Sequence, residues 1–277
     1  MDKQKLRDYF KLTLLILLIS VVGAVTIYGL FYGGAAILAW IMESHYERVA
    51  RNVIDPKAAA YIFEEYPGND FDVGAAYMLF KDNCYRVEVQ SRSSQDTRFN
   101  VDFHHKTHEV ERDSFGKDVT EKENTFARLE KTYNSLVQDS LEPVEYLHYK
   151  SGKFRRYSET TSQSSYFSPE GLDRSTLTLD QPYDSALGEN YGYLQFTAVL
   201  PEDPIDIHSA LKVLTEIDQT LAEDGVRYCM VDIKLIDAEY PETTESFRLW
   251  DIRREDLLCE DPLARLTELW EEQQSSK

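Results

Sequence analysis

The residues best suited to chemistry lie in one pentapeptide, which reads His-His-Lys-Thr-His, begins at residue 104 and holds half of the six histidines. Imidazole nitrogens are ligands for zinc, copper and nickel. We expect His104 and His108 to lie on one side of a turn after a strand, with Asp102 or Glu109 near enough to add a carboxylate. His104, His105 and His108 are therefore a candidate metal site. The alternative is a polar turn with solvated imidazoles, because the pentapeptide lacks the Cys and Glu-x-x-His spacings of zinc sites.

Other motifs that carry chemistry are sparse. A Gly-x-Ser-x-Gly nucleophile motif and a phosphate-binding glycine loop are absent from the sequence. The stretch from Asp70 to Gly74 resembles the start of a calcium loop, but Lys81 stands where the twelfth position requires an acidic residue. The numerous tyrosines and phenylalanines are typical of a packed core, although they could also line a ligand groove. These observations favour a non-catalytic protein, and an enzyme with an unfamiliar site is the alternative.

An uncharged run from Leu12 to Met42 indicates where the protein resides. It exceeds the about 20 residues that a helix needs to cross the hydrocarbon core of a bilayer. Basic residues precede it at positions 3, 5, 7 and 11, and such residues favour the cytoplasmic side. We therefore expect a single-pass cell-membrane protein with a cytoplasmic tail over 1–11, a transmembrane helix over 12–42 in the lipid bilayer, and an extracytoplasmic remainder. A signal peptide cleaved after Ala24 is the alternative, but it would leave an apolar stretch at the new N-terminus.

Gly29 and Gly33 form a GxxxG pattern within this run. Small residues at this spacing let two helix backbones approach closely, as they do in membrane-helix dimers. The pattern predicts packing in a homodimer or against another membrane protein. Small residues are also common in membrane helices that do not associate, so the pattern by itself leaves both outcomes open.

The chain is strongly acidic, with 30 Lys and Arg against 49 Asp and Glu and a formal net charge of −19. Asp2 and Asp8 are the only acidic residues before the uncharged run, so the acidity belongs to the part that follows it. A surface of this sign repels nucleic acid and attracts cations or basic partners. We therefore expect no nucleic-acid partner, although acidity also serves simply to keep a domain soluble.

The elements that must position these residues alternate between helix and strand patterns. Helical signals over 43–66, in two pieces that meet at Asp55-Pro56, precede short alternating runs from Phe71 to Glu111, which predict an antiparallel meander. Helical spacing returns from Asn124. We expect these elements to form a first α+β module over 43–150.

A polar connection over 151–190, rich in Ser, Thr, Gln and Arg, leads to a second module over 191–277. That module is predicted to contain a strand, an amphipathic helix, two further strands and a last helix. Grouped strands with interspersed helices predict an α+β fold in which antiparallel sheets pack against amphipathic helices. The whole chain is thus expected to be α+β behind an N-terminal transmembrane helix.

Several short segments resemble the YfjL-like proteins of Gram-positive bacteria, which are single-span proteins with an extracytoplasmic region. They are Tyr61-Ile62-Phe63, Tyr66-Pro67, Tyr85-Arg86-Val87-Glu88-Val89, Phe99-Asn100-Val101, Asp113-Ser114-Phe115, Phe126-Ala127-Arg128-Leu129 and Phe247-Arg248-Leu249. The resemblance implies an anchored extracellular module, with no established reaction and no site residues to carry over. Together with the uncharged run it predicts a non-catalytic binding or interaction module at the bacterial cell surface, with a metal-binding protein or an enzyme as alternatives.

Overall fold

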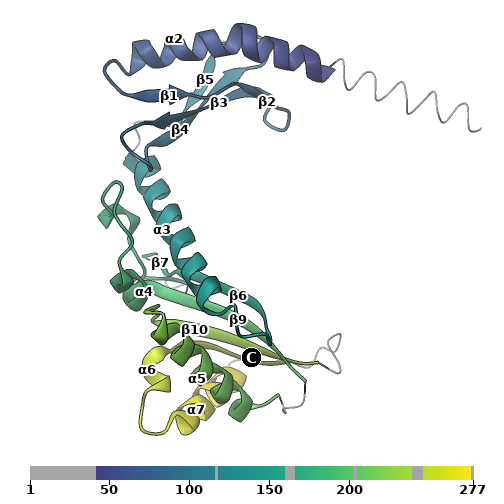
Figure 1. Ribbon diagram of the computed structural model, residues 1–277, viewed down its shortest axis with the longest axis vertical. Helices are drawn as coiled ribbons and strands as arrows, with labels where there is room; N and C mark the ends of the chain where they lie inside the picture. The colour runs from purple at the N-terminus through teal and green to yellow at the C-terminus, as the bar shows by residue number, and fades with distance from the viewer. Residues whose placement is uncertain (1–41, 116–117, 160–165, 202–204, 239–245, 276–277) are drawn as a thin grey trace, which may run out of the picture. The chain divides into compact units, whose positions relative to one another are not determined.

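The computed structural model describes residues 42–115, 118–159, 166–201, 205–238 and 246–275 (Figure 1). The chain forms two compact units, one of Met1–Arg92 with Phe99–Phe115 and one of Ser93–Arg98 with Gly116–Lys277. Each combines helices with a sheet, so the α+β prediction is confirmed. The expected tail over 1–11 and all of the expected span before Met42, including Gly29 and Gly33, lie outside the described residues. Within the described ranges, every helix is too short or too polar to cross a membrane.

The first helix of unit 1 continues through the boundary expected at Asp55-Pro56. Residues 42–49 are α-helical, η1 (Ala50–Ile54) is a π-helical segment, and α2 (Asp55–Glu65) follows directly. Helix α2 begins at Asp55, where the second helical piece was predicted to begin, but it follows η1 without a break. A proline is tolerated in the first turn of α2, and the wider π turn leads into it. The Asp55 carboxylate accepts a 2.7 Å hydrogen bond from the amide of Ala76.

The sheet of unit 1 confirms the predicted meander. Its strands are β1 (Phe71–Val73), β2 (Tyr77–Leu79), β3 (Cys84–Ser91), β4 (Arg98–His104) and β5 (Val110–Asp113). The strand order is β1-β3-β4-β5, and β2 also pairs with β3. The pairs β1–β3, β2–β3 and β4–β5 are antiparallel. Tyr85, Val87 and Val89 of β3 are buried against the helix, and the alternate residues are more exposed, as their period of two predicts.

The sheet of unit 2 contains β6 (Leu147–Phe154), β9 (Gly192–Leu200), β10 (Met230–Asp237) and β11 (Ser246–Arg253), in the order β11-β10-β9-β6. The outer pairs are antiparallel, but β9 and β10 are parallel. The expectation of purely antiparallel sheets is therefore wrong for unit 2. The reason is α5 (Ile207–Glu223), which connects β9 to β10 and returns the chain to the same end of the sheet.

The units divide the chain at a different place from the expected modules. Helix α3 (Asp118–Ser140), expected to close the first module, belongs to unit 2. Its apolar side chains Phe126, Leu129, Tyr133 and Val137 share a core with β6, β9 and α5. The helical spacing of α3 predicted an apolar face correctly, but it carries no information about which sheet that face covers.

The expected connection over 151–190 is also part of unit 2. It contains the end of β6 and four short elements, and a last pair of helices follows β11. These elements are β7 (Arg156–Tyr157), β8 (Phe167–Ser168), η2 (Arg174–Thr176), α4 (Ser185–Tyr191), α6 (Arg254–Leu257) and α7 (Pro262–Ser275). Helices α5, α6 and α7 lie together beside β10 (Figure 1).

The two faces of the unit 2 sheet differ in chemistry. One face contributes Leu194, Phe196 and Ala198 of β9, with Val231, Ile233 and Leu235 of β10, to the core shared with α3, α5 and α7. Because side chains alternate along a strand, Gln195, Thr197, Asp232 and Lys234 point to the opposite face. We call that surface the open face.

Candidate functional site

A groove of about 420 Å³ lies on the sheet of unit 2, and its lining includes the open-face residues Gln195, Thr197, Asp232 and Lys234 together with the core residues Phe196, Ile233 and Leu249. The groove combines aromatic rings with amide, carboxylate and basic groups. Its lining residues are Tyr149, Gln195, Phe196, Thr197, Asp232, Ile233, Lys234, Arg248, Leu249 and Trp250. Concave surfaces with a few convergent polar groups beside aromatic rings are typical of ligand sites. We call this surface the open-face groove.

A β-bulge shapes the groove at the centre of the β10–β11 pair. The register shifts between Val231 and Ile233, so that Trp250 and Asp251 together stand opposite Asp232. Asp251 has φ +59°, a left-handed conformation that few residues other than glycine adopt. The bulge frees the amide of Asp251 from the ladder, and this amide donates a 2.8 Å hydrogen bond to Oδ1 of Asp232. The bulge therefore orients a carboxylate that lines the groove.

A buried tyrosine holds the other oxygen of the same carboxylate. The Tyr193 hydroxyl donates a short hydrogen bond to Oδ2 of Asp232, and Nε2 of Gln195 donates to the Tyr193 oxygen at 3.3 Å. Tyr193 is only 4 % exposed. Hydrogen bonds from two neighbouring strands, β9 and β11, thus hold the two carboxylate oxygens of Asp232 and fix the side chain in the groove.

The two carboxyl groups at the bulge bind protons more tightly than usual. Burial raises the pKa of Asp232, although hydrogen bonds from Tyr193 and the Asp251 amide oppose the shift. Burial, and then the negative charge of Asp232, raise the pKa of Asp251 to about 6, with Arg155 acting in the opposite direction. Neighbouring carboxyls with raised pKa values are typical of functional sites, although structural networks also produce them.

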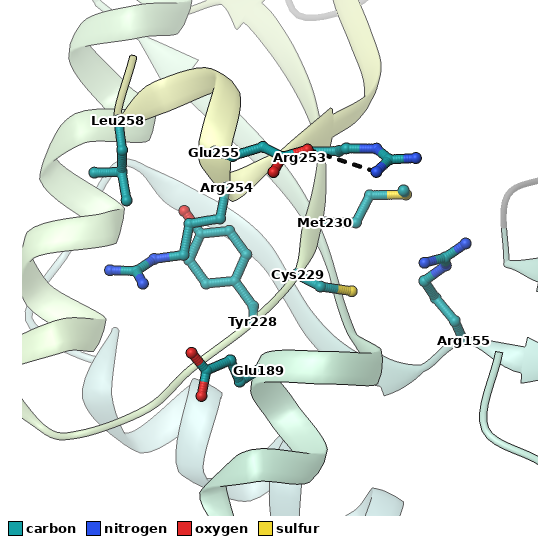
Figure 2. A pocket seen from close by; sticks show the side chains of 9 residues that line it. All are labelled: Arg155, Glu189, Tyr228, Cys229, Met230, Arg253, Arg254, Glu255 and Leu258. Carbon is teal, nitrogen blue, oxygen red and sulfur yellow. Dashed lines mark ion pairs between the residues drawn. The ribbon is translucent and has the colours of Figure 1, made fainter. Parts of the chain in front are cut away.

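A second hollow of about 300 Å³ lies where β10 begins and β11 ends (Figure 2). We call it the arginine pocket, and its lining residues are Arg155, Glu189, Tyr228, Cys229, Met230, Arg253, Arg254, Glu255 and Leu258. Figure 2 shows the Cys229 thiol directed toward the side where Arg155 lies, whereas Arg254 extends beside the ring of Tyr228. The guanidinium carbon of Arg254 is 5.8 Å from the centroid of that ring.

Carboxylates within or beside the arginine pocket already pair with its guanidinium groups. Arg254 Nε lies 2.7 Å from Asp218 Oδ1, Arg253 lies 3.5 Å from Glu255, and Arg155 lies 3.5 Å from Glu170. The pocket therefore offers little net positive charge for an anion.

The surroundings of the Cys229 thiol in the same pocket disfavour its reactive thiolate form. It donates to the carbonyl of Gly192 at 3.1 Å, and burial raises its pKa even though Arg155 lies near enough to oppose the shift. Because the thiolate is the nucleophile, a raised pKa argues against nucleophilic catalysis here. Of the two hollows, the open-face groove is the better candidate site.

The three histidines predicted as metal ligands lie in the turn between β4 and β5. Nδ1 of His104 accepts a hydrogen bond from the amide of Thr107 at 3.2 Å, and the rings of His104 and His105 are 5.0 Å apart. The ring of His108 lies instead against Tyr85, at 6.1 Å between centroids. The described part of the chain holds no group of three His, Cys, Asp or Glu side chains placed to bind one metal ion.

The carboxylates expected to complete that site have other partners. Asp102 accepts hydrogen bonds from Nε of Arg86 at 2.7 Å and from Nε of Arg112 at 2.9 Å. Glu109 pairs with Lys57 at 3.2 Å. Both carboxylates are therefore already paired with basic side chains. The pentapeptide forms a turn in which the His108 amide donates a 2.8 Å hydrogen bond to the His104 carbonyl.

The sequence did not predict a functional role for the residues of the open-face groove, although Arg248 and Leu249 belong to a segment that resembles the YfjL-like proteins. Asp232 and Lys234 alternate with apolar residues of β10, which signals only that they avoid the core. Asp251 carries no signal, because its role depends on the bulge. Comparison with protein-family models, with curated proteins and with solved structures finds no match to this chain.

Proposed function

We propose that the chain is a single-pass membrane protein whose extracytoplasmic part binds a glycan of the cell envelope in the open-face groove. The uncharged run from Leu12 to Met42 and the basic residues before it support the anchor and its orientation. The observation that carries the binding function is the groove itself, in which Trp250, Asp232 and Gln195 meet on one surface. Residues 12–42 contact lipid in this proposal, and Gly29 with Gly33 offer a surface for self-association.

The chemistry of the groove favours a neutral, hydroxyl-rich ligand. A hydroxyl both donates and accepts hydrogen bonds, and the groove supplies an acceptor in Asp232, donors in Arg248 and Lys234, and both roles in Gln195. Trp250 adds the flat apolar surface that matches the C–H face of a sugar ring. The net charge of −19 disfavours polyanionic ligands.

The test is calorimetric titration of the full-length protein in detergent micelles with soluble, uncharged cell-wall glycan fragments. Tyr149 lines the groove and is 47 % exposed, whereas Tyr157 lies outside it and is 45 % exposed. Tyr149→Ala is expected to weaken binding at least about tenfold, because it removes an aromatic contact surface. Tyr157→Ala is the matched control, and its affinity should equal that of the parent.

Two results would refute the binding proposal. One is the absence of heat from any glycan fragment, and the other is an equal loss of affinity in the two tyrosine variants. The anchor is tested separately by adding protease to intact cells. Cleavage after residue 42, with a membrane-bound N-terminal fragment left behind, supports the proposed orientation, and full protection would contradict it.

A further inference from the structure

Exposed apolar side chains of unit 1 include three close in sequence or space to the residue at which the described part of its helix begins. Met42 is 51 % exposed, Tyr77 of β2 is 41 % exposed, and Phe80 in the β2–β3 turn is 64 % exposed. Tyr77 and Phe80 line a hollow of about 380 Å³, whose other lining residues are Glu43, Tyr46, Glu47, Ala50, Arg51, Asp55, Ala75, Ala76 and Met78. Met42 precedes the lining residue Glu43 directly. Figure 1 shows β2 and its turn beside the helix, toward the end at which the described residues begin. We call Met42, Tyr77 and Phe80 the juxtamembrane patch.

Ring contacts hold the β2–β3 turn against the helix. The ring of Tyr46 meets that of Phe80 edge to face, at 5.2 Å between centroids and 88° between planes, and it also lies 6.4 Å from Tyr85 in the core. Tyr46 follows Met42 by four residues, which is about 6 Å along a helix axis. Phe80 is therefore fixed about one helical turn from the residue where the uncharged run of the sequence ends.

The charges around the juxtamembrane patch have both signs. The hollow is lined by Glu43, Glu47 and Asp55 on the acidic side and by Arg51 on the basic side, and Lys81 follows Phe80 directly. Electrostatic attraction to an anionic surface is thus a weak driving force here. Exposed aromatic rings followed by a lysine are instead typical of the interface between hydrocarbon and water, where rings sit at headgroup depth and lysine extends to the aqueous side.

We propose that the juxtamembrane patch rests in the outer headgroup region of the bilayer and thereby holds unit 1 against the membrane. The inference rests on the membrane anchoring in the proposed function, because the occupant it assigns is the bilayer that residues 12–42 cross. The position of the patch supports that occupant over a protein partner, since a chain that leaves the bilayer at Met42 brings Phe80 to the lipid surface without further folding.

The test places a photoreactive benzoylphenylalanine at one position at a time in the full-length chain, reconstituted in phosphatidylglycerol and phosphatidylethanolamine vesicles. The positions are Phe80, Phe63 and Leu30. Phe63 of α2 is the matched control, because it is also an exposed phenylalanine, at 79 %. It lies about 25 Å further along the helix axis than Tyr46, which contacts Phe80. Leu30 reports on the anchor alone, as it lies in the middle of the uncharged run. After irradiation, mass spectrometry detects covalent lipid adducts.

The expected result is a lipid adduct at positions 80 and 30 with at least tenfold less at position 63. A lipid adduct at position 30 without one at position 80 refutes the membrane contact of the juxtamembrane patch but supports the transmembrane anchor. Equal adducts at 80 and 63 overturn it as well, because exposure alone would then explain the labelling. A crosslink from 80 to a second copy of the chain in place of lipid assigns the patch to a dimer and also overturns it. Absence of an adduct at both 30 and 80 refutes the anchor together with the patch.

Discussion

The backbone amide of Asp251 donates a 2.8 Å hydrogen bond to Oδ1 of Asp232, across the bulge that joins β10 and β11. This contact places two carboxyl groups beside each other on the open face of unit 2. Burial raises the pKa of both, and the charge of Asp232 raises that of Asp251 further. Asp232 of the open-face groove therefore lies beside a second carboxyl group, Asp251, whose pKa is raised to about 6.

Asp251→Asn is expected to stabilise the protein at pH 7.5 and to flatten its pH dependence. The ordinary pKa of an aspartate is about 4, and that of Asp251 is about 6 in the folded protein. Between these values the folded state binds a proton that the unfolded state has released, so stability falls as pH rises through this window and stays lower above it. Asparagine removes the ionised form and still tolerates a positive φ.

The measurement is urea unfolding between pH 4 and pH 8. We expect a gain of about 1 kcal/mol at pH 7.5, less than the full shift would give because the side chain is only partly buried. Asp224→Asn, at an exposed helix end, is the control and should leave the free energy of unfolding at pH 7.5 close to that of the parent. A variant whose stability depends on pH as steeply as the parent's would contradict the role assigned to Asp251.

Asp102→Asn is expected to destabilise unit 1 by about 3 kcal/mol, because it removes a buried carboxylate charge and leaves the largely buried Arg86 without its partner, whereas Arg112 is more exposed. Burial by itself would raise the pKa of Asp102, but Arg86 and Arg112 hold it below its ordinary value. A lowered pKa contributes stability at neutral pH that is lost as pH falls through the acid range below about 4. The variant should therefore also show a shallower acid unfolding curve.

The matched control for Asp102 is Asp72→Asn. Asp72 pairs with Arg92 at 2.5 Å, but both side chains are more than half exposed. Exposed ion pairs contribute little to stability, because water screens their charges. Chemical denaturation of both variants should separate them clearly, and similar losses would show that burial does not set the strength of the Asp102 cluster.

Gly192→Ala is expected to destabilise unit 2 by about 1–3 kcal/mol or more. An added Cβ at Gly192 would stand 2.4 Å from the carbonyl oxygen of Gly188 and 2.4 Å from the hydroxyl of Tyr133. Tyr133 cannot withdraw freely, because its hydroxyl donates to the Arg227 carbonyl at 3.0 Å in the core. Thermal unfolding checks this, with Gly225→Asn as a control at a position with φ +73° and open space around it. Equal melting temperatures for Gly192→Ala and the parent would show that the packing is looser than described.

The three cysteines are expected to differ in reactivity toward a thiol reagent. All are free, with Cys84 buried, Cys229 partly buried and Cys259 exposed. Burial also raises the pKa of Cys84 and of Cys229. At pH 8 the folded protein should therefore release one equivalent of a chromogenic disulfide reagent rapidly, and Cys259→Ser should abolish that phase. Three equivalents should react in denaturant, and a fast phase that survives in Cys259→Ser would contradict this assignment.

Helices and strands whose patterns depend on residues close together in the chain were predicted correctly from the sequence. The alternation of Tyr85, Val87 and Val89 predicted a strand with one buried face, and the spacing from Phe126 to Leu141 predicted an amphipathic helix. The YfjL-like resemblance and the span over 12–42 stay predictions. Within unit 1, the acidic partners expected for the histidines are instead paired with Arg86, Arg112 and Lys57.

The α+β class, the approximate places of most helices and strands, and the uncharged run can be read from the sequence, because periodicity and composition are local properties of the chain. Three features emerge only from the folded chain: α3 belongs to unit 2, β9 and β10 are parallel, and the Asp251 amide meets Asp232. An apolar helix face or strand must be buried, but its own residues do not select the partner that buries it. Strand pairing and a bulge then bring together carboxyls nineteen residues apart, at a distance that no local pattern records.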